Sequence, residues 1–150
     1  MASNFSTNNS TKLTASLVRK TLFDFAKAMC DWELWVYKKG REGMNSENEN
    51  TTLRTQARSE LEAIFSHYVI KKNKNYDRIE NLVCGLHSEY LFNKDLIELD
   101  TSNEKSATVI FEKNSGLTQK YRITFTIENE TCKISKREYL DNEKWRRAYV

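Results

Sequence analysis

The chain has 150 residues, of which 39% are hydrophobic and 30% are charged. This composition is typical of one folded, water-soluble domain and excludes a chain that is disordered throughout. The 24 Lys and Arg residues against 21 Asp and Glu residues give a formal net charge of +3, which is too balanced to favour a dedicated nucleic-acid-binding protein. The three cysteines are widely spaced and form no Cys-x-x-Cys pair, so they indicate neither a disulfide framework nor a zinc site.

The N-terminal segment, "MASNFSTNNSTK", is polar and lacks the apolar run of a signal peptide. Charged residues also interrupt every hydrophobic segment before it reaches the length of about 18 residues that a membrane span needs. We therefore expect a flexible tail over residues 1–12, a single domain over residues 13–150, and a cytoplasmic protein that contacts no membrane.

The first long pattern in the chain predicts a helix. Thr14 can cap its start, and Gly40 and Gly43 are expected to stop it. Its apolar residues recur at steps of three and four, which places them on one face. These residues are Val18, Leu22, Phe25, Met29, Trp32 and Val36.

Two further helices are expected after an acidic, Asn-rich loop that runs through Asn50. The second helix extends from about Thr52 to Lys71, with a continuous apolar face. A third, shorter helix is expected between Tyr76 and Phe92, weakened by Gly85. The apolar positions of this third helix are Ile79, Val83, Leu86 and Tyr90.

From Leu96 onward the apolar period changes from 3.6 to 2, which predicts strands. Strands are expected around 107–112 and 121–128, and from Thr131 to about Tyr139, with turns at "NSG" and "ENET". The clean alternation indicates an antiparallel sheet with one face buried against the helices and a polar, Thr-rich opposite face. The fold class is therefore α+β.

The sequence shows little catalytic chemistry. It contains no glycine-rich nucleotide motif, no nucleophile elbow, no HExxH and no calcium loop, and His67 and His87 have no spaced ligand partner. No catalytic residue, metal ligand or cofactor is predicted.

The two ends of the chain resemble a known family. The first helix carries "FDFAKAMCDWELWVYK", with Met29, Trp32, Glu33 and Tyr37. The chain ends on "KISKREYLDNEKWRRAYV", in which Lys136, Glu138, Tyr139 and Trp145 stand out. In these features the sequence is similar to the immunity-protein branch of the nuclear transport factor 2-like fold. The resemblance implies a cone of helices wrapped by a curved antiparallel sheet.

The resemblance also implies a function. Proteins of this branch are bacterial immunity factors, which bind and neutralise a toxin domain by covering its active or substrate-binding surface. We expect Trp145 and Tyr139 to be anchored in the fold. The residues expected to meet the toxin are Glu47 and Glu49 of the acidic loop, Arg122 and Thr124 of the sheet, and Lys136, Arg137, Arg146 and Arg147 near the C-terminus.

Two other functions stay open at this point. A cone fold could hold a small-molecule isomerase or dehydratase, which requires a deep pocket with a carboxylate or His of perturbed pKa and fails if aromatic side chains fill the interior. A ligand- or nucleic-acid-binding module using "KKNK" and the terminal arginines would bind with a steep salt dependence. The sequence does not indicate the oligomeric state.

Overall fold

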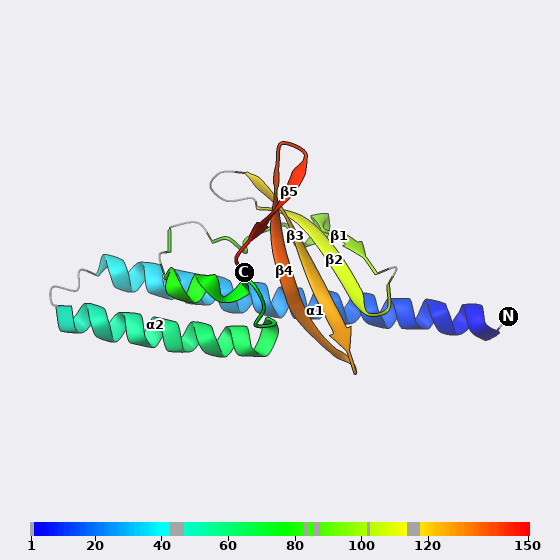
Figure 1. Cartoon of the computed structure of the whole chain (residues 1–150), viewed down its shortest axis with the longest axis horizontal. Helices are drawn as coiled ribbons and strands as arrows, with labels where there is room; N and C mark the ends of the chain where they lie inside the picture. Colours follow the sequence, from blue (N-terminus) through cyan, green and yellow to red (C-terminus); the bar gives the residue numbers. More distant parts are fainter. Residues whose placement is uncertain (1, 43–46, 83, 86–87, 102, 114–117) are drawn as a thin grey trace.

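The computed structural model describes residues 2–42, 47–82, 84–85, 88–101, 103–113 and 118–150, with the side chains of 2–11 and 47–48 outside the description. Two helices, α1 (Ala2–Arg41) and α2 (Glu47–Tyr68), lie side by side, and a five-stranded sheet crosses over the middle of α1 (Figure 1). The fold is α+β, as predicted.

Helix α1 buries the predicted apolar stripe, since Leu22, Phe25 and Met29 are fully buried. The helix begins at Ala2 rather than at Thr14, so Thr14 is not its N-cap. The physical reason is that residues 2–13 contain neither Gly nor Pro and therefore nothing that stops a helix from continuing. The division into a tail over 1–12 and one domain over 13–150 remains a prediction.

The end of α1 also differs from the prediction. Gly40 lies inside the helix, where a side chain would meet open space, and Gly43 lies outside the described residues. Helix α2 starts at Glu47, so the expected acidic loop through Asn50 is partly helical. The same helix ends at Tyr68 rather than at Lys71, because Ile70 leaves the helix and its N–H donates to Ile134 O of the sheet at 2.8 Å.

The prediction of a third helix between Tyr76 and Phe92 is wrong. Its described part contains the short 3-10 helix η1 (Asn75–Glu80) and then an irregular path, and a second 3-10 turn, η2 (Lys94–Leu96), follows. Two backbone N–H groups of this segment donate to side chains instead of to a helical carbonyl. Glu89 N donates to Glu33 Oε2 at 3.1 Å, and Tyr90 N donates to Ser88 Oγ at 3.1 Å. The bond to Glu33 comes from a distant part of the chain and outweighs the weak helical period. Ile79 and Tyr90 are buried as the pattern predicts, and Val83 and Leu86 lie outside the described residues.

The sheet is an antiparallel meander in the order β1-β2-β3-β4-β5. The hairpin β3–β4 turns at Asn129–Glu130, within the predicted "ENET", whereas "NSG" lies outside the described residues. A β-bulge between Thr124 and Phe125 interrupts the β3–β4 register. The strands are β1 (Glu98–Asp100), β2 (Ser106–Lys113), β3 (Gln119–Glu128), β4 (Thr131–Asp141) and β5 (Lys144–Ala148).

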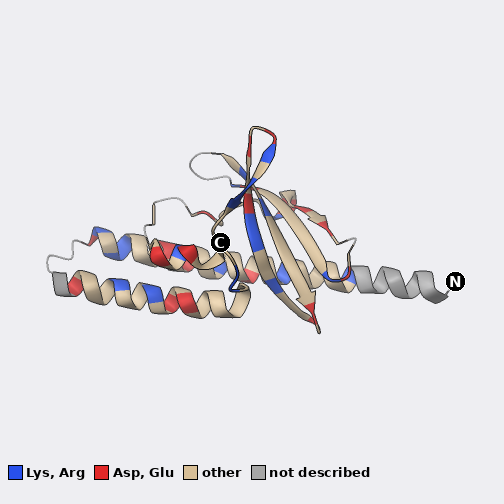
Figure 2. Ribbon diagram, in the orientation of Figure 1, with Lys and Arg blue, Asp and Glu red and all other residues tan. Residues whose placement is uncertain are grey.

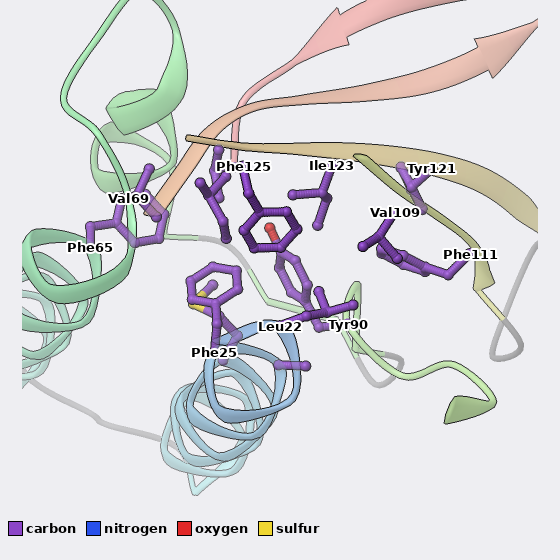
Figure 3. Close-up of a cluster of buried hydrophobic side chains, with 14 of the residues drawn as sticks. Leu22, Phe25, Phe65, Val69, Tyr90, Val109, Phe111, Tyr121, Ile123 and Phe125 are labelled. Atoms are coloured by element: carbon purple, nitrogen blue, oxygen red, sulfur yellow. The ribbon is translucent and has the colours of Figure 1, made fainter. Parts of the chain in front are cut away.

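The core lies between α1, the end of α2 and the inner face of the sheet, and Figure 3 shows its aromatic centre. Phe25 of α1 packs edge-on against Tyr90 of the irregular segment, with ring centroids 5.0 Å apart. Phe65 of α2 and Phe125 of β3 are also fully buried. Helices, irregular segment and sheet therefore share one core.

The β3–β4 turn gives the first testable prediction. Glu130 has a φ of 63°, a left-handed conformation that costs a non-glycine residue about 1–2 kcal/mol. Glycine relieves this strain but loses about 0.5–1 kcal/mol through its freedom in the unfolded chain. We expect Glu130→Gly to raise the free energy of unfolding by about 0.5 kcal/mol in urea denaturation. Thr131→Gly, at the first residue of β4, is the control and should destabilise the protein; an equal loss from both variants would contradict the explanation.

Candidate functional site

The sheet face that points away from the helices carries side chains from three strands, and those of β3 and β4 are mostly polar. The register pairs Arg122 with Glu138, Thr124 with Lys136, and Leu140 with Trp145, and paired residues share a face. The intervening residues of β3, such as Ile123, are buried on the opposite side. We call the first group the outer sheet face: Arg122, Thr124, Lys136, Glu138, Leu140 and Trp145.

An ion-paired fork organises the outer sheet face. Arg122 donates from Nε and Nη2 to the two Glu138 oxygens, at 3.0 and 3.1 Å, which is the bidentate geometry that fixes both side chains. Its guanidinium also lies 4.5 Å from the ring centroid of Trp145. Lys136 Nζ lies 3.6 Å from Glu138 Oε1 and keeps 40% of its side chain exposed. Two cations thus surround one carboxylate, which leaves this patch basic and rigid.

Thr124 lies on the same face, but its hydroxyl oxygen is covered and has no hydrogen-bond partner in the described structure. The backbone oxygen of Thr124 accepts a bond from Ser135 Oγ at 3.1 Å, across the bulge. Thr124 therefore contributes shape to the surface rather than an accessible hydroxyl.

The two arginines of β5 diverge from one another. Arg146 is exposed and pairs with Asp141, with an Nε to Oδ2 distance of 2.6 Å. It lies on the opposite side of the strand from Trp145, because neighbouring residues alternate. Arg147 pairs with Glu138 in the register, and its Nη2 donates to Asn75 Oδ1 of η1 at 3.0 Å. Figure 2 shows Lys and Arg along β4 and on the β4–β5 hairpin.

Arg137 does not stay available to a partner, which corrects the prediction. Only 4% of its side chain is exposed, and its guanidinium lies 4.0 Å from the ring centroid of Tyr121. Its Nη2 donates to Glu89 Oε2 at 3.1 Å, and its Nη1 donates to the backbone oxygen of Tyr149 at 3.2 Å. The bulge is the physical reason, because the extra residue Ser135 moves Arg137 to the inner face.

Glu89 is the centre of this buried cluster. Its Oε2 accepts from both Arg137 and Tyr121, and Lys113 Nζ lies 3.5 Å from its Oε1. Burial alone would raise the pKa of Glu89, but the charge of Arg137, the hydrogen bond from Tyr121 and the charge of Lys113 outweigh it and hold this pKa below its usual value. Burial also raises the pKa of Tyr121 to about 12. The carboxylate is therefore ionised and the phenol neutral at neutral pH.

A second buried charge, Glu33 of α1, lies in the interior. Burial raises its pKa, although the Arg78 charge and the hydrogen bond from Glu89 N work in the opposite direction. Arg78 is itself buried, with its guanidinium 5.6 Å from the Trp32 ring and 5.8 Å from the Tyr149 ring. Sequence reasoning gave Arg78 and Glu89 no role and linked Glu33 only to the family resemblance. Glu33 is a charged residue between Trp32 and Leu34 on an apolar stripe, which is a signal of a buried charge, whereas Arg78 stands in a polar stretch that gives no such signal.

The described interior is packed with side chains. It holds a carboxylate of raised pKa, Glu33, as the enzyme alternative requires, but its core is filled by buried side chains that include Phe25, Phe65, Phe125 and Trp32. Over the described residues, no group of three His, Cys, Asp or Glu side chains is arranged to hold a metal. In the same part of the chain, no helix is long and apolar enough to cross a membrane.

The predicted residues at the start of α2 lie apart from the outer sheet face. Glu49 is exposed there, while the side chain of Glu47 is outside the described part. Figure 1 places the start of α2 at one end of the molecule, beyond the sheet. Trp145 and Tyr139 are half-buried, as expected for anchored aromatics.

Helices packed on one face of a twisted antiparallel meander, with a polar opposite face, define an α+β protein of the nuclear transport factor 2-like class. The family model described as "NTF2 fold immunity protein" matches residues 17–149, so the chain belongs to that family. It is 27% identical over 133 residues to Immunity protein RhsIA of Dickeya dadantii (strain 3937), a match that covers 87% of this chain and 93% of that protein. No solved structure matches the chain significantly.

The Glu89 cluster gives the second prediction. We expect Glu89→Gln to lower the free energy of unfolding at pH 7 by about 2 kcal/mol, less than the loss for a fully buried pair because about a third of Glu89 is exposed, at 32%. Because its folded pKa is lowered, Glu89 stabilises the protein above its unfolded pKa of about 4.3, and this contribution is lost as the pH falls further.

Urea unfolding between pH 3 and pH 7 measures both effects. The difference between the unchanged protein and Glu89→Gln should shrink as the pH falls below about 4.3. Glu98→Gln, on the exposed side of β1, is the matched control and should change little. A constant difference across the pH range would refute the assignment of the charge pair.

Proposed function

We propose that this protein neutralises a cognate bacterial toxin domain by binding it through the outer sheet face and covering its active or substrate-binding surface. The observation that carries the proposal is the basic, pre-ordered patch formed by Arg122, Lys136 and Trp145. The chain that presents this patch belongs to the family of NTF2 fold immunity proteins. The relative RhsIA carries the name of an immunity protein, which supports the same role.

The patch has the physical properties of a binding surface. Its side chains are held before binding, so a partner does not have to order them, which reduces the entropic cost of association. Aromatic residues and arginines are also the side chains that contribute most to protein interfaces. A toxin surface with exposed carboxylates would complement Arg122 and Lys136 and would associate faster at low salt.

We further propose that the protein acts by binding and not by catalysis, in the cytoplasm of a bacterial cell exposed to toxins from contacting neighbours. Family membership supports this mode of action. The contacts of Glu33 support it as well, because the carboxylate accepts from Glu89 N and lies near Arg78 among packed aromatic side chains.

The experiment combines growth protection with calorimetry. The chain is co-expressed with the toxin domain encoded beside it, and the affinity of the purified pair is measured. We expect a one-to-one complex of nanomolar affinity. Lys136→Glu should weaken it at least tenfold, mainly through slower association, because it replaces an exposed cation of the patch by an anion.

Lys12→Glu is the matched control, since it makes the same charge reversal at an exposed residue before the family-matched region. Arg122→Glu is the stronger test at the patch, with thermal unfolding as a check because it also breaks the bond to Glu138. Equal affinity for Lys136→Glu and Lys12→Glu would exclude the outer sheet face. Absence of both protection and binding would exclude the immunity role toward this toxin.

The start of α2 is the second proposed contact. Glu47 and Glu49 could oppose a basic part of the toxin, and the exposure of Glu49 agrees with this. The double variant Glu47→Lys, Glu49→Lys should then lower the affinity in the same calorimetric measurement. Unchanged affinity would remove the start of α2 from the interface.

A further inference from the structure

A groove lies between the C-terminal part of α1, the first half of α2 and η1. Its volume is about 720 Å³, within the range of binding pockets. Leu53 and Leu82 line it and are half-buried, and Ala57 and Ile79 form its fully covered floor. In the part of the chain that the structure describes, no side chain fills this space.

The rim of the groove is basic. Arg41, Arg54 and Arg58 line it, against a single carboxylate from Glu80. Arg58 is occupied by Glu62 and Glu80, at 3.3 and 2.5 Å, and Arg41 Nη1 donates to Tyr37 Oη at 3.0 Å. Arg54 is exposed and forms no hydrogen bond or ion pair with another described residue. The apolar floor and the guanidinium groups of Arg41 and Arg54 fit a peptide segment in which an apolar side chain lies beside a carboxylate.

We propose that this groove binds an acidic segment of the toxin, whose apolar side chain enters the groove while its carboxylates meet Arg54 and Arg41. The inference rests on the proposed function and adds a third contact to it, after the outer sheet face and the start of α2. Charge complementarity selects the occupant, because Arg58 is paired with Glu62 and Glu80, whereas Arg54 and Arg41 form no ion pair with a described residue. A nucleic acid would also meet the arginines, but it offers no aliphatic side chain for Leu53 and Ile79 to cover.

Gly40 allows the groove to be filled without disturbing the fold. It lines the groove, it lies within α1, and a side chain built there meets no atom within 4 Å. Gly40→Trp should therefore occupy the space that the toxin segment needs, while replacing a poor helix former. Lys38→Trp places the same bulk on an exposed position of α1 outside the lining and is the matched control.

The test measures toxin affinity by calorimetry for the full-length chain and its variants. We expect Gly40→Trp and Arg54→Glu each to weaken binding at least tenfold, while Lys38→Trp and Arg19→Glu, the charge-reversal control at an exposed residue of α1, stay within twofold. Equal thermal unfolding midpoints would show that Gly40→Trp still folds.

The affinity measurements distinguish a failure of the groove proposal from a failure of the proposed immunity function. If the unchanged chain binds the toxin and Gly40→Trp and Arg54→Glu bind equally well, the groove proposal is overturned and the proposed function stands. If the unchanged chain does not bind, both are overturned. Binding of a single-stranded oligonucleotide that Gly40→Trp abolishes, with toxin affinity unchanged, would assign the groove to nucleic acid and also overturn the proposal.

Discussion

The buried guanidinium of Arg137 is the constraint around which much of this structure is arranged. A charge with 4% of its side chain exposed is costly unless it is paired and hydrogen-bonded. The chain meets this need from three places, with Glu89 of the irregular segment, the ring of Tyr121 in β3, and the backbone oxygen of Tyr149. These contacts connect the middle of the chain, the central sheet and the C-terminal segment.

The same constraint determines what the outer sheet face presents. The bulge at Ser135 turns Arg137 inward and leaves Lys136 and Glu138 on the other side of β4. Glu138 then meets Arg122 across the strand pair, and Arg122 in turn covers Trp145. The bulge therefore places Arg137, which stabilises the fold, on the inner face of β4, and Lys136, which we propose to meet the toxin, on the outer face.

The fold class and the long elements could be predicted from the sequence, because they depend on regular periods. The stripe through Leu22, Phe25 and Met29 and the alternation in β3 both report burial directly. The segment before β1 could not be predicted, because its path depends on bonds such as Glu89 N to Glu33 that connect residues distant in the sequence.

The candidate site was only partly predictable for a similar reason. Arg122 and Lys136 follow from the alternation of β3 and from the family resemblance. The burial of Arg137 does not, since a bulge shifts every later side chain of β4 to the other face and leaves no sharp mark in the sequence. The groove was also missed, because its lining comes from three separate elements.

Hydroxyl-radical footprinting of the toxin complex tests the central claim most directly, because it reports side-chain exposure at single residues. Trp145 lies on the outer sheet face, and Leu13, at 73% exposure in the N-terminal half of α1, is an internal reference. The account predicts that the oxidation of Trp145 falls severalfold on binding while that of Leu13 is unchanged. Oxidation of Trp145 at the same rate in the free and bound protein would show that the toxin docks elsewhere.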